Sequence, residues 1–472
     1  MTLDLSPDEF RRLGHAAIEQ LANVLDAHQR PDSPARPPIP ADVVNALHHQ
    51  PLPQDGATAE SILERVFSDV LPYPMGNNNP RFFAWVNSTA APLGILAELL
   101  AAAHNPSVAG GNHAATYVEH ATLNWLKEFM GYPATAGGLL VSGGSMANLV
   151  ALGVMRHVKG SDVRQTGMVN QAAPMVIYTS IQGHSCIQKA VEALGFGSAY
   201  LRHLPVDANY RMDIAALQAA IAADRAAGLL PVAVAASAGT VSTGAVDPFN
   251  AIADICTAEN LWFHIDGAYG AVGILADSVR DQYAGLDRAD SIALDPHKWM
   301  YVPIECGCVL VKDAAAMRAA YSLVPPYLQH DNELAWFSEF GLQQTRGFRA
   351  LKLWMTIQQL GAAGYQALIT RDIDLAHQLA AKVTQHPAFE LIAPANLSIV
   401  CFRYAPVGAT DLDRLNRLLL EAVQADGRVF ITGTVINGVQ CIRACIVNFR
   451  TQPHDLDLLL DVLTELGERL TD

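Results

Sequence analysis

The pentapeptide Asp295-Pro-His-Lys-Trp299 holds the residue types best suited to chemistry. It follows the apolar run Ser291–Leu294, which is typical of a buried strand, and Pro296 ends that strand. Lys298 is therefore expected just past a strand end, where catalytic side chains often lie in an α/β sheet. Partial desolvation there would lower the pKa of the ammonium group and free the amine as a nucleophile. The pentapeptide alone fits a surface lysine beside a turn equally well.

Three other motifs follow apolar runs in the same way. Ser142-Gly-Gly-Ser145 joins a predicted strand to a predicted helix, and such a joint can bind a small phosphate through the free N–H groups of the helix start. Asp266 leaves an apolar strand, where a carboxylate needs a partner such as a cation. His184 lies at a strand-to-helix junction, where an imidazole can stack on a flat ring.

Each of these motifs also has a purely structural interpretation. The glycine joint fits a plain turn, and it matches neither the Walker nor the dinucleotide-binding spacing. Asp266 and His184 fit helix caps. Taken together, however, the residues meet the needs of pyridoxal 5′-phosphate. Its phosphate needs a helix N-terminus, its pyridine nitrogen needs an acid, and its aldehyde needs a lysine for a Schiff base.

The bulk composition limits the partners of the protein. Its 472 residues are 51% hydrophobic and 16% charged, which supports a sizeable core. The net charge of −15 disfavours nucleic acid and anionic membranes as partners. The apolar runs are too short to span a membrane, and the first ten residues lack an export pattern. Seven scattered cysteines predict reduced thiols in a cytoplasmic protein, and the histidines show no metal-binding spacing.

The order of predicted elements indicates three parts. Residues 1–78 form an arm, in which a helix capped by Ser6, a proline-rich connector and a second helix at 59–70 lack a core of their own. Residues 79–350 alternate strands and helices, which indicates an α/β domain with a mainly parallel sheet and helices on both faces. Residues 351–472 predict a smaller α+β domain.

The motifs resemble those of the group II pyridoxal-phosphate decarboxylases, the branch that holds aromatic L-amino-acid decarboxylase and its bacterial relatives. The matching segments run in order along nearly the whole chain: NPRFFAW (79–85), GGSMANLVAL (143–152), QGHSCIQKA (182–190), AGTVSTGAVDP (238–248), HIDGAYG (264–270), DPHKW (295–299) and TRGFRALKLW (345–354). The resemblance implies the fold-type-I architecture of pyridoxal-phosphate enzymes. It also implies a homodimer whose active site lies near the subunit interface, and a carboxy-lyase that converts an L-amino acid to its amine and CO₂.

The resemblance implies a role for each residue around the cofactor ring. Lys298 would form the Schiff base, and Asp266 would pair with the pyridinium nitrogen. His184 would stack on one face of the ring and Ala268 would lie on the other. Thr240 would contact the phenolic edge.

The phosphate would be held by Gly144, Ser145 and His297. Asp295 stands where relatives often carry an asparagine near the phosphate. Because an ionised carboxylate repels a phosphate dianion, we expect Asp295 to point elsewhere or to accept backbone N–H bonds.

The implied substrate site departs from the family pattern. Relatives carry Tyr-Phe-Pro-Thr where this chain has Trp85, Val86, Asn87 and Ser88, and Arg443 matches an arginine near the substrate. The single aromatic favours an aromatic L-amino acid, and the added amide keeps a smaller or more polar one as an alternative.

A tyrosine on a loop supports protonation of the carbanion in this family. Tyr327 lies at the start of that loop, whereas counting back from Arg346 places Phe337 at the tyrosine position. Phenylalanine cannot deliver a proton. In some relatives this exchange accompanies oxidative deamination, so an aldehyde is the alternative product. Transamination on the same cofactor is a further alternative, which the TRGFRALKLW segment and His184 disfavour. A non-catalytic binding protein is another, which the intact Lys298, Asp266 and His184 disfavour.

Overall fold

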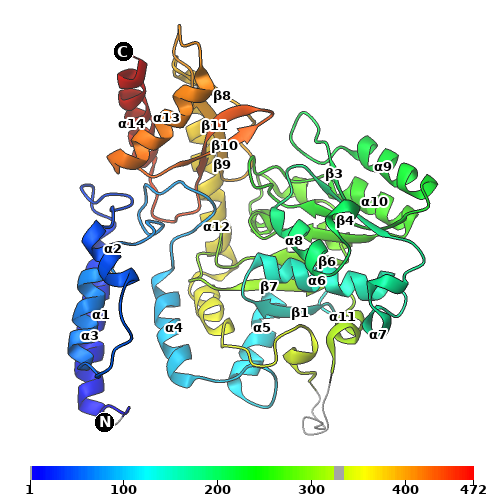
Figure 1. The fold of residues 1–472 in the computed structure, drawn as a ribbon, viewed down its shortest axis with the longest axis horizontal. Helices are drawn as coiled ribbons and strands as arrows, with labels where there is room; N and C mark the ends of the chain where they lie inside the picture. The colour runs from blue at the N-terminus through cyan, green and yellow to red at the C-terminus, as the bar shows by residue number, and fades with distance from the viewer. Residues whose placement is uncertain (1–2, 324–333, 472) are drawn as a thin grey trace. The chain divides into compact units, whose positions relative to one another are not determined.

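The computed structural model describes residues 3–323 and 334–471. The chain forms two compact units, which Figure 1 colours along the sequence. Unit 1 comprises residues 1–89, 381–392 and 402–472, and unit 2 comprises residues 90–380 and 393–401. The predicted division at residues 78 and 350 stays a prediction.

Unit 2 is built on a seven-stranded sheet in the order β1-β7-β6-β5-β4-β2-β3. The strands are β1 (Gly137–Val141), β2 (Met175–Ser180), β3 (Leu201–Leu204), β4 (Leu230–Ser237), β5 (Trp262–Asp266), β6 (Ser291–Leu294) and β7 (Gly307–Val311). Strands β3, β2, β4, β5 and β6 pair in parallel, and β7 runs antiparallel to β6 and β1. The predicted, mainly parallel sheet is therefore confirmed.

Helices cover both faces of this sheet. Unit 2 contains α4 (Pro92–His104), α5 (Ala114–Phe129), α6 (Gly144–Lys159), α7 (Val163–Thr166), α8 (Ser185–Ala193), α9 (Ile214–Ala226), α10 (Phe249–Glu259) and α11 (Ala314–Tyr321), of which α5, α6, α9, α10 and α11 pack on strands of the sheet. Helix α6 packs on β5, β6 and β7, whereas α10 packs on β4 and β5. Central strands covered on both faces are apolar throughout, which is why every residue of β6 and β7 is buried.

The long helix α12 (Ala350–Gln385) consists of two helical segments that meet at a kink. The kink lies at Gly361, whose φ of 64° is in the left-handed region that glycine tolerates.

Unit 1 contains α1 (Pro7–Ala27), α2 (Ala41–His48), α3 (Ala59–Asp69), α13 (Leu412–Asp426) and α14 (Pro453–Thr471). A smaller sheet has the order β10-β11-β9-β8, from β8 (Phe389–Leu391), β9 (Ile399–Tyr404), β10 (Thr432–Ile436) and β11 (Val439–Cys445). The pairs β10–β11 and β8–β9 are antiparallel, and α13 packs on α14 and β11. The predicted α+β character of the C-terminal segment is confirmed.

The N-terminal arm begins as predicted. The Ser6 hydroxyl accepts the N–H of Glu9, and the Glu9 carboxylate accepts the N–H of Ser6, which completes a capping box. Helix α2 begins directly after Pro40, the last proline of the connector, and was not predicted. Proline is well tolerated at a helix start, so a proline-rich stretch can precede a helix without entering it.

Within residues 3–323 and 334–471, no helix is both long and apolar enough to cross a membrane.

Candidate active site

Two acidic residues lie at one edge of the large sheet. Asp266 is the last residue of β5, and Asp295 directly follows β6. Because β5 and β6 pair in parallel, their carboxyl ends meet at the same edge. Lys298 follows Asp295 by one turn, and its Nζ lies 3.0 Å from Asp295 Oδ2. The structure thus brings these three predicted residues together. We call the set formed by them and by Gly143, Gly144, Ser145 and His184 the Lys298 edge.

The predicted lowering of the Lys298 pKa is wrong. Burial does lower the pKa of this ammonium group, but the carboxylates of Asp295 and Asp266 more than offset it, so the pKa lies above its usual value. Burial raises the pKa of Asp295 as well, with Lys298 opposing that shift. Both directions follow from one ammonium group facing two acids in a poorly solvated place. Lys298 is therefore held as a cation before any ligand engages it.

Asp266 is buried, and its two oxygens accept different donors. Oδ1 accepts the N–H of Ala268 at 3.2 Å, and Oδ2 accepts the thiol of Cys186 at 3.5 Å. The first contact is the local turn that the structural interpretation anticipated. Neither donor carries a charge, so the carboxylate can still pair with a cationic ligand atom.

His184 is the N-cap of α8, and its Nδ1 accepts the N–H of Cys186 at 3.1 Å. The helix-cap interpretation is thus correct. The cap fixes the ring through one nitrogen while the side chain stays exposed. An exposed ring in a fixed orientation is compatible with stacking on a planar ligand, and that stacking stays a prediction.

The N-terminus of α6 faces Asp295 and Ala268. A Cβ atom added at Gly144 would lie 2.7 Å from Asp295 Oδ2 and 2.8 Å from the Ala268 Cβ, so only glycine fits there. Ser145 is exposed in the first helical turn. A bare backbone, free helix N–H groups and a hydroxyl suit a small phosphate. These residues fit pyridoxal phosphate, which needs an anion site beside a lysine and an acid.

Two other predicted cofactor residues, His297 and Thr240, are placed by local contacts. His297 Nδ1 lies 2.8 Å from the carbonyl oxygen of Cys306, and His297 Nε2 lies 3.8 Å from Asp295 Oδ2. Thr240 is buried, its Oγ1 2.9 Å from Thr243 Oγ1 and 3.1 Å from the Ala245 nitrogen. Their contacts with a cofactor stay predictions.

Sequence reasoning missed a backing layer of buried polar residues behind the Lys298 edge. One network joins the Asn148 amide to His264 Nε2 at 2.6 Å and His264 Nδ1 to Ser291 Oγ at 2.9 Å. Asn148 also donates to Cys186 Sγ at 3.2 Å, and thus connects to the donor of Asp266. Asn148 and His264 lie inside quoted motifs, yet a pattern cannot reveal that they touch across 116 residues.

The second network of the backing layer comes from α12. Asp372 Oδ2 accepts the indole N–H of Trp299 at 2.9 Å and the hydroxyl of Tyr301 at 2.7 Å. Tyr365 donates to the carbonyl of Met300 at 3.1 Å. The three residues after Lys298 are therefore fixed by one helix. An aspartate within a predicted helix is expected to face solvent, so the sequence offered no reason to single out Asp372.

The predicted substrate residues lie in unit 1. Trp85 is 42% exposed with φ of 51°, and buried Arg443 donates to its carbonyl at 2.9 Å. Asn87 donates to Met75 Sδ at 3.5 Å, and buried Ser88 accepts the Asn77 amide through its carbonyl at 2.8 Å. Unit 1 thus holds Trp85 and Arg443 together, and their contact with a substrate stays a prediction.

Of the two predicted loop residues, Tyr327 and Phe337, the structure describes only Phe337. Tyr327 lies outside the described residues. Phe337 begins a short 3-10 turn and is 2% exposed, with its ring 4.5 Å from that of His120 and 5.0 Å from the Arg346 guanidinium. Its exchange for the loop tyrosine stays a prediction.

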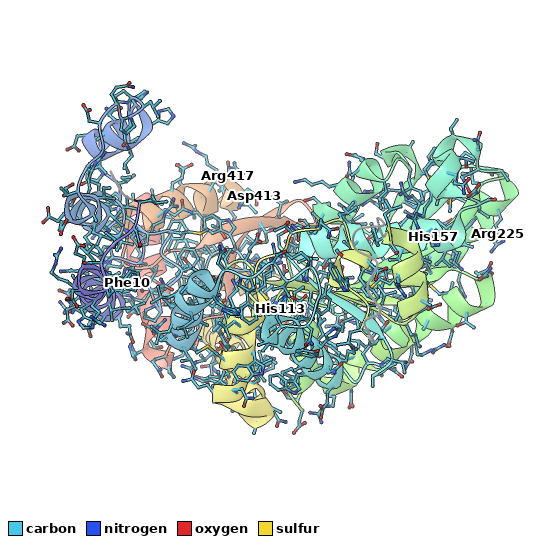
Figure 2. All side chains as sticks on the ribbon, turned by 90° about the horizontal axis from the view of Figure 1, so that it is seen from below. Phe10, His113, His157, Arg225, Asp413 and Arg417 are labelled. Carbon is cyan, nitrogen blue, oxygen red and sulfur yellow. The ribbon has the colours of Figure 1, made fainter. Side chains whose placement is uncertain are left out.

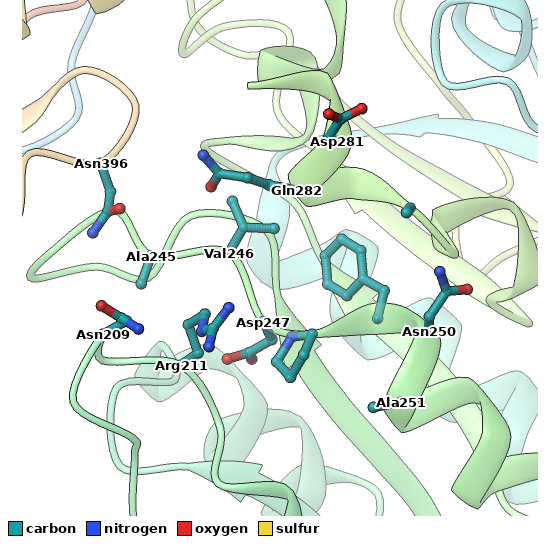
Figure 3. A pocket seen from close by; sticks show the side chains of 13 residues that line it. Asn209, Arg211, Ala245, Val246, Asp247, Asn250, Ala251, Asp281, Gln282 and Asn396 are labelled. Carbon is teal, nitrogen blue, oxygen red and sulfur yellow. The ribbon is translucent and has the colours of Figure 1, made fainter. Parts of the chain in front are cut away.

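A cavity of about 440 Å³ lies elsewhere in unit 2 (Figure 3). Asp247 lines it but already accepts the N–H groups of Met212 and Ser237, both at 2.7 Å. Arg211 pairs with Asp207 at 2.8 Å. Among the described residues, none of the predicted site residues lines this cavity, which is therefore separate from the Lys298 edge.

Comparisons with known proteins agree with this geometry. Residues 40–405 match the family described as the pyridoxal-dependent decarboxylase conserved domain. An aromatic-L-amino-acid decarboxylase of Bacillus atrophaeus is 32% identical over 99% of this chain and 98% of its own. A phenylacetaldehyde synthase of Petunia hybrida is 29% identical over 97% and 94%. The crystal structure of an Oryza sativa TDC with PLP and tryptamine covers all of both chains with a TM-score of 0.93 and 28% identity.

Proposed function

The chain belongs to the pyridoxal-dependent decarboxylase family, and we propose that it converts an aromatic L-amino acid to its amine and CO₂. It is a carboxy-lyase that depends on pyridoxal phosphate. The observation that carries the proposal is the Lys298 edge, where a lysine, two acids and a glycine-rich helix start meet at the ends of β5 and β6. The relative from Bacillus atrophaeus supports the aromatic substrate through its name.

Each residue of the Lys298 edge would have a separate role in holding the cofactor. Lys298 would hold the cofactor through its amine, and the α6 start with Ser145 and His297 would bind the phosphate. Asp266 would keep the ring nitrogen protonated, and His184 and Ala268 would fix the ring plane. Bound in this way, the cofactor supplies an electron sink for the electron pair left at Cα when CO₂ departs.

The substrate would be positioned by residues of unit 1. Trp85 exposes a broad aromatic surface, and aromatic rings favour stacked or edge-to-face partners. Arg443 would fix the backbone of Trp85, and Asn87 and Ser88 would supply polar contacts. The polar pair keeps a smaller amino acid as the alternative substrate.

The alternative product is an aldehyde. The relative from Petunia hybrida bears the name phenylacetaldehyde synthase, which supports this route. The route requires that no hydroxyl reprotonates the carbanion. Burial of Phe337 against His120 and Arg346 favours a packing role for that residue, so Tyr327 remains the candidate proton donor.

Product analysis tests the proposal. Purified enzyme loaded with cofactor is supplied with single amino acids, and CO₂, amine, aldehyde and hydrogen peroxide are measured together. We expect CO₂ and amine in equal amounts, with aromatic amino acids preferred. Aldehyde with peroxide would establish the alternative product, whereas keto acid without CO₂ would contradict decarboxylation.

We also propose a cytoplasmic homodimer in which the arm covers the partner subunit. Helices α1 and α3 leave large apolar side chains exposed, among them Phe10 (labelled in Figure 2), Ile18 and Ile62. An apolar face on a helix pair without its own core needs a partner surface. Removal of residues 1–75 should give insoluble or inactive protein, and a soluble, active monomer would contradict this assembly.

A further inference from the structure

The carboxylate of Asp295 is incompletely partnered. The residue is 6% exposed, and its Oδ2 accepts from Lys298 Nζ at 3.0 Å. Its Oδ1 is buried and has no hydrogen-bond partner within residues 3–323 and 334–471. A buried carboxylate oxygen without a donor is costly, so a group outside the described chain is expected to complete it.

The unpartnered carboxylate lies against the N-terminus of α6. A Cβ atom added at Gly143 would lie 3.9 Å from Asp295 Oδ1, and one at Gly144 would lie 2.7 Å from Oδ2. The expectation that Asp295 points away from this helix start is therefore wrong. It pairs with Lys298 and stays beside the site where the phosphate would bind.

Lys298 is the cation that can neutralise Asp295. The groups that face Asp295 are His297 and Lys298 on its own loop, Asp266 on β5, His184 and Cys186 at the start of α8, and Cys306 and Cys308 at β7. Burial lowers the pKa of His297, and burial raises the pKa of each thiol, so these groups favour their neutral forms. The α6 residues Gly143, Gly144 and Ser145 carry no titratable group.

Binding of the cofactor would change the charges that face the Asp295 carboxylate. Lys298 would give its amine to the cofactor, and Asp295 would lose the ammonium partner that keeps it ionised. The phosphate would at the same time place negative charge at the α6 start. Two like charges in a buried place favour protonation of one of them.

We propose that Asp295 is ionised and paired with Lys298 in the cofactor-free enzyme, and takes up one proton when the phosphate binds. The ammonium group of Lys298 releases this proton when its amine condenses with the aldehyde of the cofactor and water leaves, and the resulting O–H of Asp295 donates to a phosphate oxygen. Asp295 is thus a proton-linked determinant of phosphate binding. This inference rests on the proposed placement of the phosphate at the α6 N-terminus.

Infrared difference spectroscopy tests the proton uptake. Spectra of the full-length protein with pyridoxal phosphate minus the cofactor-free protein are recorded for the wild type and for Asp295→Asn. We expect a carboxylic-acid C=O band that appears in the wild type, shifts in D₂O and is absent from Asp295→Asn. Asp372→Asn, which alters a buried acid away from α6, should retain the band.

The outcomes separate the two proposals. A wild-type spectrum without the acid band, or a band that persists in Asp295→Asn, would overturn the proton uptake, and the wild type alone decides even where the variant fails to fold. The visible absorbance of the same samples reports cofactor loading. Wild-type protein that takes up no cofactor, or takes it up unchanged in Lys298→Ala, would overturn the proposed site instead.

Discussion

The polar groups of the Lys298 edge and those of the backing layer are partnered differently. In the backing layer both ring nitrogens of His264 are hydrogen-bonded, and Asp372 Oδ2 accepts two buried donors. Asp372 Oδ1 and Asp295 Oδ1 are alike in lacking a hydrogen-bond partner among the described residues. The Lys298 edge differs because Ser145 and His184 are exposed beside its ion pair, so these groups can contact a ligand. A buried hydrogen-bond network instead favours a single stable arrangement.

This contrast predicts that changes at the Lys298 edge will affect activity and that changes in the backing layer will affect stability. Four variants test this difference between the Lys298 edge and the backing layer.

Lys298→Ala should abolish decarboxylation. Loss of the amine removes the cofactor's attachment, so we expect kcat to fall by at least about 10³-fold. Lys298→Ala also leaves the buried Asp295 carboxylate without its ammonium partner, so the free energy of unfolding should fall by about 1–3 kcal/mol, too little to explain the loss of activity. CO₂ release and urea unfolding measure the two quantities. Lys312→Ala is the matched control and should leave both unchanged, and a Lys298→Ala variant that releases CO₂ at the wild-type rate would break the contrast.

Asp372→Leu should unfold more easily. It strips the buried Trp299 N–H and Tyr301 O–H of their acceptor, which costs about 2–5 kcal/mol in unfolding free energy. Asp372→Asn keeps an acceptor oxygen for both donors and should recover most of the loss. Urea unfolding at one pH compares the three proteins. Equal stability of the leucine and asparagine variants would show that the two hydrogen bonds do not hold the loop.

The pH dependence of stability should differ between the wild type and Asp372→Asn. Burial raises the pKa of Asp372 to about 7, above the value near 4 of an unfolded aspartate. Between these values the folded state binds the extra proton, so this group's contribution falls as pH rises and is fully lost above about pH 7. From pH 5 to pH 8 the wild type should lose about 2–3 kcal/mol relative to the variant. Parallel stability curves would contradict a raised pKa.

Gly144→Ala should weaken cofactor binding, and the clash of the new Cβ with the Ala268 Cβ at 2.8 Å should lower stability as well. The new Cβ would lie 2.7 Å from Asp295 Oδ2, and the carboxylate must shift to make room. We expect affinity for pyridoxal phosphate to fall about tenfold, which is about 1.4 kcal/mol. Gly347→Ala, with no atom within 4 Å of the added Cβ, is the control. Unchanged affinity would show that the α6 start does not approach the cofactor.

Much of the large sheet could be predicted from the sequence. Strand β6 was predicted at its observed bounds, because a strand buried on both faces is an unbroken apolar run between turn residues. Helices α4 and α5 were not predicted. In α4 the apolar residues surround the helix and leave no 3.6-residue pattern to recognise.

The candidate site also has features that the sequence predicted and features that it did not. Lys298, Asp266 and His184 were found because each follows an apolar run at a strand end. The raised pKa of Lys298 was missed, since it depends on charges that folding brings together rather than on burial alone. Asp372 was missed because its donors lie 71 and 73 residues away in the chain.

The central claim is that the Lys298 edge holds the cofactor. The direct measurement is borohydride reduction of the enzyme as purified, followed by proteolysis and mass spectrometry of the peptides. We expect one reduced pyridoxyl phosphate group on the peptide that contains Lys298, and none on that peptide in Lys298→Ala. A pyridoxyl group on a different lysine, or none after loading with cofactor, would contradict it.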